Sequence, residues 1–256
     1  MDFNYRKPLH LLALLMMIGS IFVIIISPIL TFFNVPSFDT PSNYDSLGYN
    51  LNLMLEAFIL IFYLAFAFIF FILFPLLWYV LVNDISIKKA FSRIRVTLEN
   101  IDMAFLWGIL TVFIIFGITF VLEFVLEQSG ADMSDLSNVP DLEALFSPTI
   151  LFFLVAIMPI AEEIFFRGFL MEKFEGFAGK NFAIFMSAVL FGIAHMSYGK
   201  IYPVIMPIFM GIILGYVVLK TRNLYSAIIA HVSLNVSVIL LAFIGQEILK
   251  NASLIL

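Results

Sequence analysis

Long apolar runs separated by short polar segments make up almost the whole chain. A membrane-spanning helix needs roughly 20 predominantly apolar residues, whereas strands of a transmembrane barrel show short alternating segments. Seven long runs are present, at residues 9–33, 52–82, 102–126, 147–171, 181–198, 201–220 and 224–248. We therefore expect an all-α fold, a polytopic transmembrane helical bundle of about seven spans.

The amino-acid composition also indicates a membrane protein. Of its 256 residues, 63% are hydrophobic and only 12% are charged, and the mean hydropathy is +1.11. Soluble domains are closer to half apolar and a quarter charged. The net charge is −5 and the basic residues are scattered in short loops, so we expect a lipid bilayer as a partner and no nucleic acid. The expected location is the cell membrane, with multiple passes.

Lys and Arg set the expected orientation, because cytoplasmic loops carry an excess of these residues. With seven spans, one side of the membrane holds only Lys200 and Lys250, while the other side holds Arg6, Lys7, Lys88, Lys89, Arg93, Arg95, Lys173, Lys180, Lys220 and Arg222. This bias predicts a cytoplasmic N-terminus. The basic segment 85–96 fits either a helix along the lipid surface or a plain cytoplasmic loop.

Two regions follow from the spans and their polar residues. Residues 1–144 form an N-terminal three-span region with a basic cytoplasmic loop, and residues 145–256 form a four-span core that we expect to be one structural unit.

Three charged residues interrupt the apolar run of the fourth span. Each charge near the bilayer centre costs roughly 2.5–3.5 kcal/mol, so these groups need partners or water. Glu163 and Arg167 are four residues apart and can form an ion pair, whereas Glu162 lies about 100° around the helix. Pro159 lacks the amide that would continue the helix ladder and should loosen this span. We expect a structural pair, Glu163 and Arg167, and a separate functional carboxylate, Glu162.

Histidines on later spans can join Glu162. A hairpin turn in residues 172–180 would bring His195 to the same height as Glu162. His231 and Asn235 are also four residues apart, so they share a helix face. One carboxylate, two imidazoles and one amide around a cavity could deprotonate a water molecule and stabilise an oxyanion.

The ordered patterns E-E-x-x-x-R (162–167), F-x-x-x-H (191–195) and H-x-x-x-N (231–235) resemble the CPBP intramembrane proteases. These include the type II CAAX prenyl endopeptidases and the Abi bacteriocin-immunity proteins. The resemblance covers roughly residues 145–245. It implies an all-helical membrane bundle with a cavity open to the cytosol, and an intramembrane endopeptidase as the activity.

The resemblance also implies catalytic roles. Glu162 and His195 would activate water, His231 and Asn235 would stabilise the oxyanion, and Glu163 and Arg167 would support them. A competing mechanism places Zn²⁺ on Glu162, His195 and His231, a donor set typical of hydrolytic zinc sites. We favour the metal-free mechanism and commit to no cofactor, because Asn235 is a poor zinc ligand and a zinc enzyme would need a separate base.

Two other classes of function remain open. Intramembrane Glu and His also mark ion-coupled transporters, although no inverted repeat is evident in the sequence. A non-proteolytic scaffold or immunity protein is the other alternative. The protease hypothesis predicts a peptide or protein substrate that reaches an intramembrane cavity, and the sequence leaves the identity of that substrate open.

Overall fold

The computed structural model describes residues 3–33, 49–130, 147–196 and 201–253, and every regular element within them is helical. Six segments of this described part are long and apolar enough to cross a membrane, namely Pro8–Phe33, Met54–Leu81, Ile101–Gln128, Pro148–Ala178, Tyr202–Thr221 and Tyr225–Ile248. The chain is a multi-pass membrane protein with an all-helical fold, as its apolar runs predict.

The described part of the N-terminal half contains two interrupted helices, one short helix and one long helix. The first span joins α1 (Pro8–Ile21), η1 (Phe22–Ile26) and α2 (Ser27–Phe33), and the second joins α3 (Tyr49–Ala67), η3 (Phe68–Leu73) and α4 (Phe74–Leu81). In both spans the middle element is a π-helical stretch. The half is completed by α5 (Ile87–Arg93) and α6 (Ile101–Gln128).

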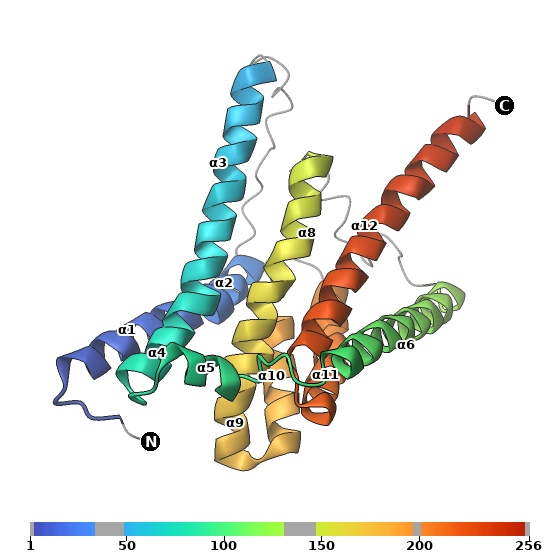
Figure 1. The fold of residues 1–256 in the computed structure, drawn as a ribbon. Helices are drawn as coiled ribbons and strands as arrows, with labels where there is room; N and C mark the ends of the chain where they lie inside the picture. The colour runs from blue at the N-terminus through green and yellow to red at the C-terminus, as the bar shows by residue number, and fades with distance from the viewer. Residues whose placement is uncertain (1–2, 34–48, 131–146, 197–200, 254–256) are drawn as a thin grey trace.

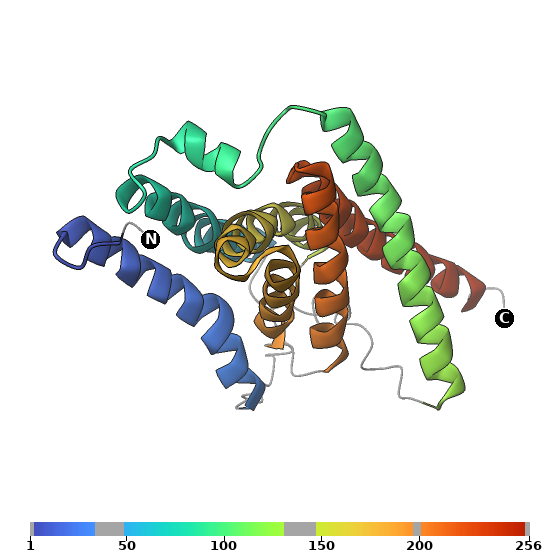
Figure 2. The same cartoon turned by 90° about the horizontal axis from the view of Figure 1, so that it is seen from below.

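The C-terminal half forms the centre of the bundle. It runs through α8 (Pro148–Glu163), η5 (Ile164–Leu170), α9 (Met171–Ala178), α10 (Lys180–Ala194), α11 (Tyr202–Thr221) and α12 (Tyr225–Ser253). Helices α8 to α11 lie in the middle, with α1 and α2 on one side and α6 on the other (Figures 1 and 2). The flanking helices α1, α2 and α6 are inclined to α3, α8 and α12.

Two sequence expectations need correction here. The fifth run, 181–198, forms only the 15-residue helix α10, which ends at Ala194. At 1.5 Å per residue it is about 22 Å long, shorter than the ~30 Å hydrocarbon core. The second correction concerns residues 172–180, where helix α9 continues to Ala178 and the turn is made at Gly179 alone.

Gly179 explains the tightness of this turn. Its φ of +85° lies in a region that glycine adopts without steric penalty. The turn leaves Glu162 and His195 almost equally far from Gly179 along antiparallel helices. The two side chains therefore meet at one height.

Close packing of α10 on α11 depends on glycines. A Cβ atom at Gly211 would lie 2.9 Å from the Cα atom of Ala188, and one at Gly192 would lie 2.7 Å from the carbonyl oxygen of Val204. Small residues allow transmembrane helices to approach closely in this way. The backbone carrying the F-x-x-x-H pattern is thus held against its neighbour.

The basic segment 85–96 is packed onto the C-terminal half. Ala90 of α5 and the following Ile94 are 0% and 1% exposed. Next to them the backbone oxygen of Arg95 accepts a hydrogen bond of 2.9 Å from the amide of Leu224. The other face of α5 exposes Lys88 and Lys89. Its contact with the lipid surface stays a prediction.

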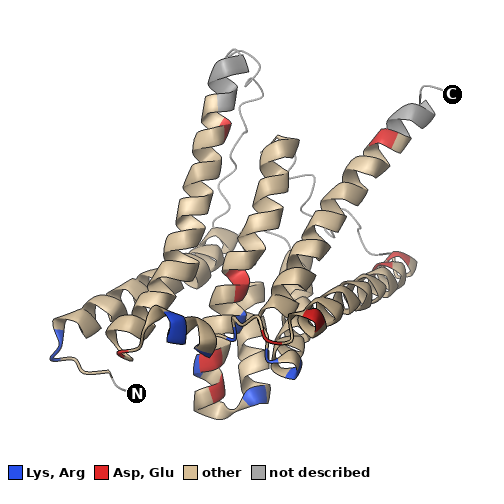
Figure 3. Cartoon of the chain, viewed as in Figure 1, with Lys and Arg blue, Asp and Glu red and all other residues tan. Residues whose placement is uncertain are grey.

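The described Lys and Arg residues gather at one end of the bundle, near α5 and the turns that follow α9 and α11 (Figure 3). Arg167 is the exception within the described part, because it is buried in the interior. Lys200 and the side chain of Lys250 lie outside the described residues. By the positive-inside rule, we expect the basic end to face the cytoplasm.

A pair of single-cysteine variants tests this orientation, because the chain contains no cysteine of its own. Ser92, beside the basic end, and Ser129, just beyond the far end of α6, are both exposed. In right-side-out membrane vesicles a membrane-impermeant maleimide should label Ser129→Cys at once and Ser92→Cys only after the vesicles are permeabilised. The reverse labelling pattern would show that the bundle is inserted the other way round.

Candidate active site

Two adjacent glutamates at the end of α8 have different surroundings. Successive residues of a helix point about 100° apart, so Glu162 and Glu163 face different neighbours. The side chain of Glu163 is 0% exposed, whereas that of Glu162 is 17% exposed. The π-helical stretch η5 begins directly after them, at Ile164. π-Helical stretches are rare and occur often at functional sites.

Glu163 forms the centre of a buried polar cluster. Its Oε1 atom accepts a hydrogen bond of 2.8 Å from Nη1 of Arg167 and lies 2.7 Å from Nδ1 of His231. The guanidinium carbon of Arg167 lies 4.1 Å from the centroid of the Phe191 ring. A buried charge is tolerated when it is paired and hydrogen-bonded. Glu163 pairs with Nη1 of Arg167 and the Phe191 ring covers the guanidinium, whereas Nε and Nη2 of Arg167 have no hydrogen-bond partner among the described residues.

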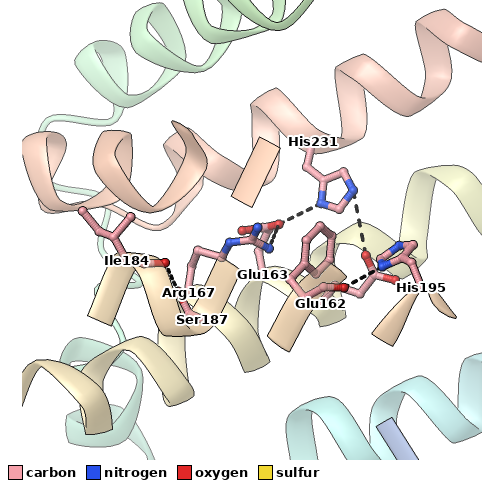
Figure 4. Close-up of polar contacts among 8 residues, drawn as sticks. Glu162, Glu163, Arg167, Ile184, Ser187, His195 and His231 are labelled. Carbon is pink, nitrogen blue, oxygen red and sulfur yellow. Dashed lines mark hydrogen bonds and ion pairs between the residues drawn. The ribbon is translucent and has the colours of Figure 1, made fainter. Parts of the chain in front are cut away.

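The contact with Glu163 orients the ring of His231. A carboxylate oxygen accepts hydrogen bonds, so Nδ1 of His231 donates the proton in this contact. The opposite ring atom, Nε2, lies 3.8 Å from Oε2 of Glu162. His231 therefore links the two glutamates, with one nitrogen held by Glu163 and the other facing Glu162 (Figure 4).

His195 is oriented by its own helix. It caps the C-terminal end of α10, and its Nδ1 atom donates a hydrogen bond of 2.8 Å to the backbone oxygen of Phe191. Carbonyl groups in the last turn of a helix lack helical partners, so the imidazole satisfies one of them. In the neutral ring, Nε2 then carries the lone pair that can accept a proton.

The ring of Phe191 lies between the charged cluster and both histidines. It makes edge contacts with His195 and His231, at centroid distances of 4.7 and 5.6 Å. The residue is 0% exposed. Phe191 thus limits the movement of both imidazoles and of the arginine at once.

Glu162 and His195 line one cavity of about 200 Å³. Phe166 and Ala194 from the neighbouring turns contribute to its wall, and five apolar residues of the first two spans complete it. A cavity of this size holds several water molecules, each of which takes about 30 Å³ in the liquid. A carboxylate and an imidazole therefore meet where a water molecule can be held.

Asn235 lies one helical turn beyond His231 on α12 and is half-buried. No hydrogen bond joins its amide to another of the described side chains, and it is not part of the wall of this cavity. The structure thus brings together Glu162, His195 and His231, and it leaves Asn235 at the edge of the group.

The residues of this site lie in a segment that matches a protein-family model. Residues 144–237 match the family model described as type II CAAX prenyl endopeptidase Rce1-like. The match covers 94 of the 256 residues, so this segment is similar to the Rce1-like, CPBP-type family. No curated protein and no solved structure matches the chain significantly. The match supports CAAX-type intramembrane protease activity in general terms, and the matched segment contains all six site residues predicted from the sequence.

The carboxylate of Glu162 and the imidazoles of His195 and His231 are ligand types that suit zinc. Within the described residues, however, no group of three His, Cys, Asp or Glu side chains is arranged to hold a metal ion. Nε2 of His231 lies 3.8 Å from Oε2 of Glu162, and Nδ1 of the same ring donates to Glu163. Because no third such side chain is arranged with this pair in the described part of the chain, no step is assigned to a metal.

The sequence interpretation missed two parts of this Rce1-like site. Phe191 entered it only as the first letter of the F-x-x-x-H pattern, although its ring touches three of the polar residues. The residues contributed by the first two spans were not identified at all. They are apolar residues in apolar runs, so no local signal distinguishes them from lipid-facing neighbours.

A substitution of Phe191 tests its positioning role. Phe191→Leu keeps an apolar side chain but removes the ring that contacts Arg167 and both imidazoles. Such aromatic contacts are each worth about 0.5–2 kcal/mol, so we expect kcat/KM for a cleaved peptide to fall about tenfold or more. Phe185→Leu on the same helix is the matched control, because Phe185 is 55% exposed towards lipid. Equal activity of the two variants would contradict the role.

Proposed function

We propose that the protein is an intramembrane endopeptidase that hydrolyses a peptide bond with water activated by Glu162 and His195. The observation that carries the proposal is the way both imidazoles are held. Nδ1 of each ring donates a hydrogen bond, to Phe191 or to Glu163, and Nε2 of His231 faces Glu162. This arrangement supports proton transfer around a single carboxylate that lies in a cavity.

In the first step, Glu162 removes a proton from a water molecule in the cavity, assisted by His195. The resulting hydroxide attacks the carbonyl carbon of the peptide bond, and the carbonyl oxygen becomes an oxyanion. His231, in its doubly protonated form with Nδ1 held by Glu163, would donate a hydrogen bond from Nε2 to that oxygen, and Asn235 would donate one from its amide. Removing one such donor typically lowers the rate by about 10²–10³-fold.

In the second step, protonated Glu162 gives its proton to the amide nitrogen as the C–N bond breaks. The products are a carboxylic acid and an amine, and Glu162 is ionised again. General acid–base catalysis of this kind requires the donor to reach both the water and the leaving group. The position of Glu162 on the cavity wall is compatible with both roles.

The substrate would be a peptide segment that enters the cavity from the cytosol or sideways from the lipid. A peptide with a prenylated C-terminal cysteine motif is the first probe, because the family description names that class. Peptides with an unmodified apolar anchor are the second probe. Cleavage of either set would identify the class that the site accepts.

Purified protein in detergent micelles, incubated with both peptide sets, provides the test. Mass spectrometry detects new C-termini, and parallel samples contain a strong chelator. We expect the same products in both conditions. Products lost with chelator and restored by Zn²⁺ would assign the site to a metal mechanism, and no product in any condition would contradict the proposal. A Glu162→Gln sample purified in the same way reveals any contaminating protease.

A further inference from the structure

The first two spans contribute part of the wall of the cavity that Glu162 lines. Five apolar residues form this part, namely Val23, Ile24, Pro28, Phe66 and Phe71. All of them lie outside the segment 144–237 that matches the protease family. The cavity therefore combines a reactive side from the family segment with an apolar side that is particular to the N-terminal half of this chain.

The π-helical stretches of this chain meet at the cavity. Val23 and Ile24 belong to η1, Phe71 belongs to η3, and Phe166 belongs to η5, so each of these stretches supplies part of the wall. One hydrogen bond ties the end of α1, directly before η1, to η3. The hydroxyl of Ser20 donates to the backbone oxygen of Phe70 at 3.1 Å, and Ser20 is 0% exposed. The apolar wall is thus held in place by a buried polar contact.

A substrate bound for hydrolysis must place a side chain against this wall. The Cβ atom of the residue that supplies the carbonyl is only two bonds, each about 1.5 Å long, from the carbon under attack. Glu162 and His195 lie on the same cavity wall as the apolar residues. A scissile bond beside Glu162 and His195 therefore brings a flanking side chain into the apolar part.

The volume limits the side chains that fit. An apolar cavity of about 150 Å³ accommodates benzene, and a water molecule takes about 30 Å³. A cavity of about 200 Å³ therefore has room for a side chain up to the size of phenylalanine together with the attacking water. A charged side chain would lose its hydration against the apolar wall, and an acidic one would also be repelled by Glu162.

We propose that Val23, Ile24 and Phe71 form a specificity subsite that selects an apolar side chain, up to the size of phenylalanine, on one of the two residues that flank the scissile bond. The inference rests on the proposed endopeptidase function. It assigns the N-terminal half a direct part in choosing the substrate, in addition to packing around the catalytic segment.

The sharpest test compares two truncations in the same π-helical stretch. Ile24 and Ile25 are 3% and 6% exposed, but only Ile24 belongs to the cavity wall. Peptides that the wild-type protein cleaves are varied at each residue flanking the scissile bond to Ala, Leu, Phe, Trp, Asp and Lys, and kcat/KM is measured. One methylene in a hydrophobic pocket changes kcat/KM by about 10–200-fold. The ratio of kcat/KM for the Trp peptide to kcat/KM for the Leu peptide should therefore rise at least tenfold in Ile24→Ala. Ile25→Ala should keep the wild-type ratio.

A second pair guards against a loss of folding in Ile24→Ala. Val23 is half-buried, so a larger side chain can be placed there, and Val23→Phe should fill the cavity. It should lower kcat/KM for Leu and Phe peptides at least tenfold relative to Ala peptides. Ile26→Phe, at a position that is 38% exposed outside the wall, should not change that ratio.

The outcomes separate this inference from the proposed function. Cleavage that depends on Glu162, with the same side-chain preference in Ile24→Ala, Val23→Phe and their controls, would overturn the subsite and leave the endopeptidase intact. A wild-type preference for Asp or Lys at both flanking positions would also overturn it. The absence of any cleavage that depends on Glu162 would remove the proposed function and the subsite together.

Discussion

Glu162→Gln should lower kcat/KM for a cleaved peptide by about 10²–10⁴-fold, the range that general acid–base catalysis contributes. Glutamine has almost the same shape as glutamate, but it can neither take a proton from water nor return one to the leaving amine. The 17% exposure of the Glu162 side chain indicates that the substitution does not disturb the buried cluster. The thermal unfolding temperature in detergent should therefore stay close to that of the wild-type protein.

Glu123→Gln provides the matched control for this measurement. Glu123 lies within the α6 membrane span and is not part of the wall of the cavity. The same chemical change at that position should leave kcat/KM within about a factor of two of the wild-type value. A Glu162→Gln variant that retains full cleavage would rule out Glu162 as the base. A biological effect of the protein that persists in a Glu162→Gln variant without cleavage would favour a scaffold.

Arg167→Met should destabilise the protein by about 3–5 kcal/mol, because it leaves a buried carboxylate without its cationic partner. Both side chains of the pair are 0% exposed, and Nη1 of Arg167 lies 2.8 Å from Oε1 of Glu163. Methionine fills much of the same volume, so the loss reflects charge and hydrogen bonding more than an empty cavity. Unfolding of purified protein with increasing SDS in mixed micelles, followed by circular dichroism, measures the change.

The double variant Glu163→Gln, Arg167→Met separates pairing from packing. Removing both charges together avoids an isolated buried ion, and such exchanges are often neutral or stabilising. We expect the double variant to recover most of the stability lost in Arg167→Met, which gives a coupling energy between the two sites. If the two single changes simply add, the ion pair does not provide the stability. Activity should stay low in the double variant, because His231 loses the carboxylate that orients it.

The two adjacent glutamates show how one helix can provide structure and chemistry together. Glu163 points into the bundle, where Arg167 and His231 hold it, while Glu162 reaches the cavity that His195 also lines. The difference arises from the rotation of about 100° between neighbouring helix positions. A carboxylate held by buried partners is poorly placed to exchange protons with water, and a carboxylate in a cavity is well placed to do so.

Much of this protein follows from sequence alone, because membranes restrict what an apolar chain can form. Backbone groups in lipid must be hydrogen-bonded internally, so long apolar runs predict helices and a multi-pass fold. Charged side chains are costly in lipid, so Glu162, Glu163 and Arg167 were expected to have a structural or functional role. Helix periodicity predicted the Glu163–Arg167 contact, because partners four residues apart are neighbours on any helix.

Only the tertiary structure decided the features that depend on distant segments. The exact length of α10 depends on where His195 can cap the helix, and apolar periodicity carries no information on that point. The contact between His231 and Glu163 joins residues 68 positions apart, and no local spacing rule predicts it. The sequence also did not predict that Ile24 and Phe71 line the cavity. An apolar residue that faces a cavity cannot be distinguished in the sequence from one that faces lipid. The lipid-facing and the protein-facing positions of a membrane helix are both apolar. The packing of one helix on another therefore determines which apolar side chains line the cavity.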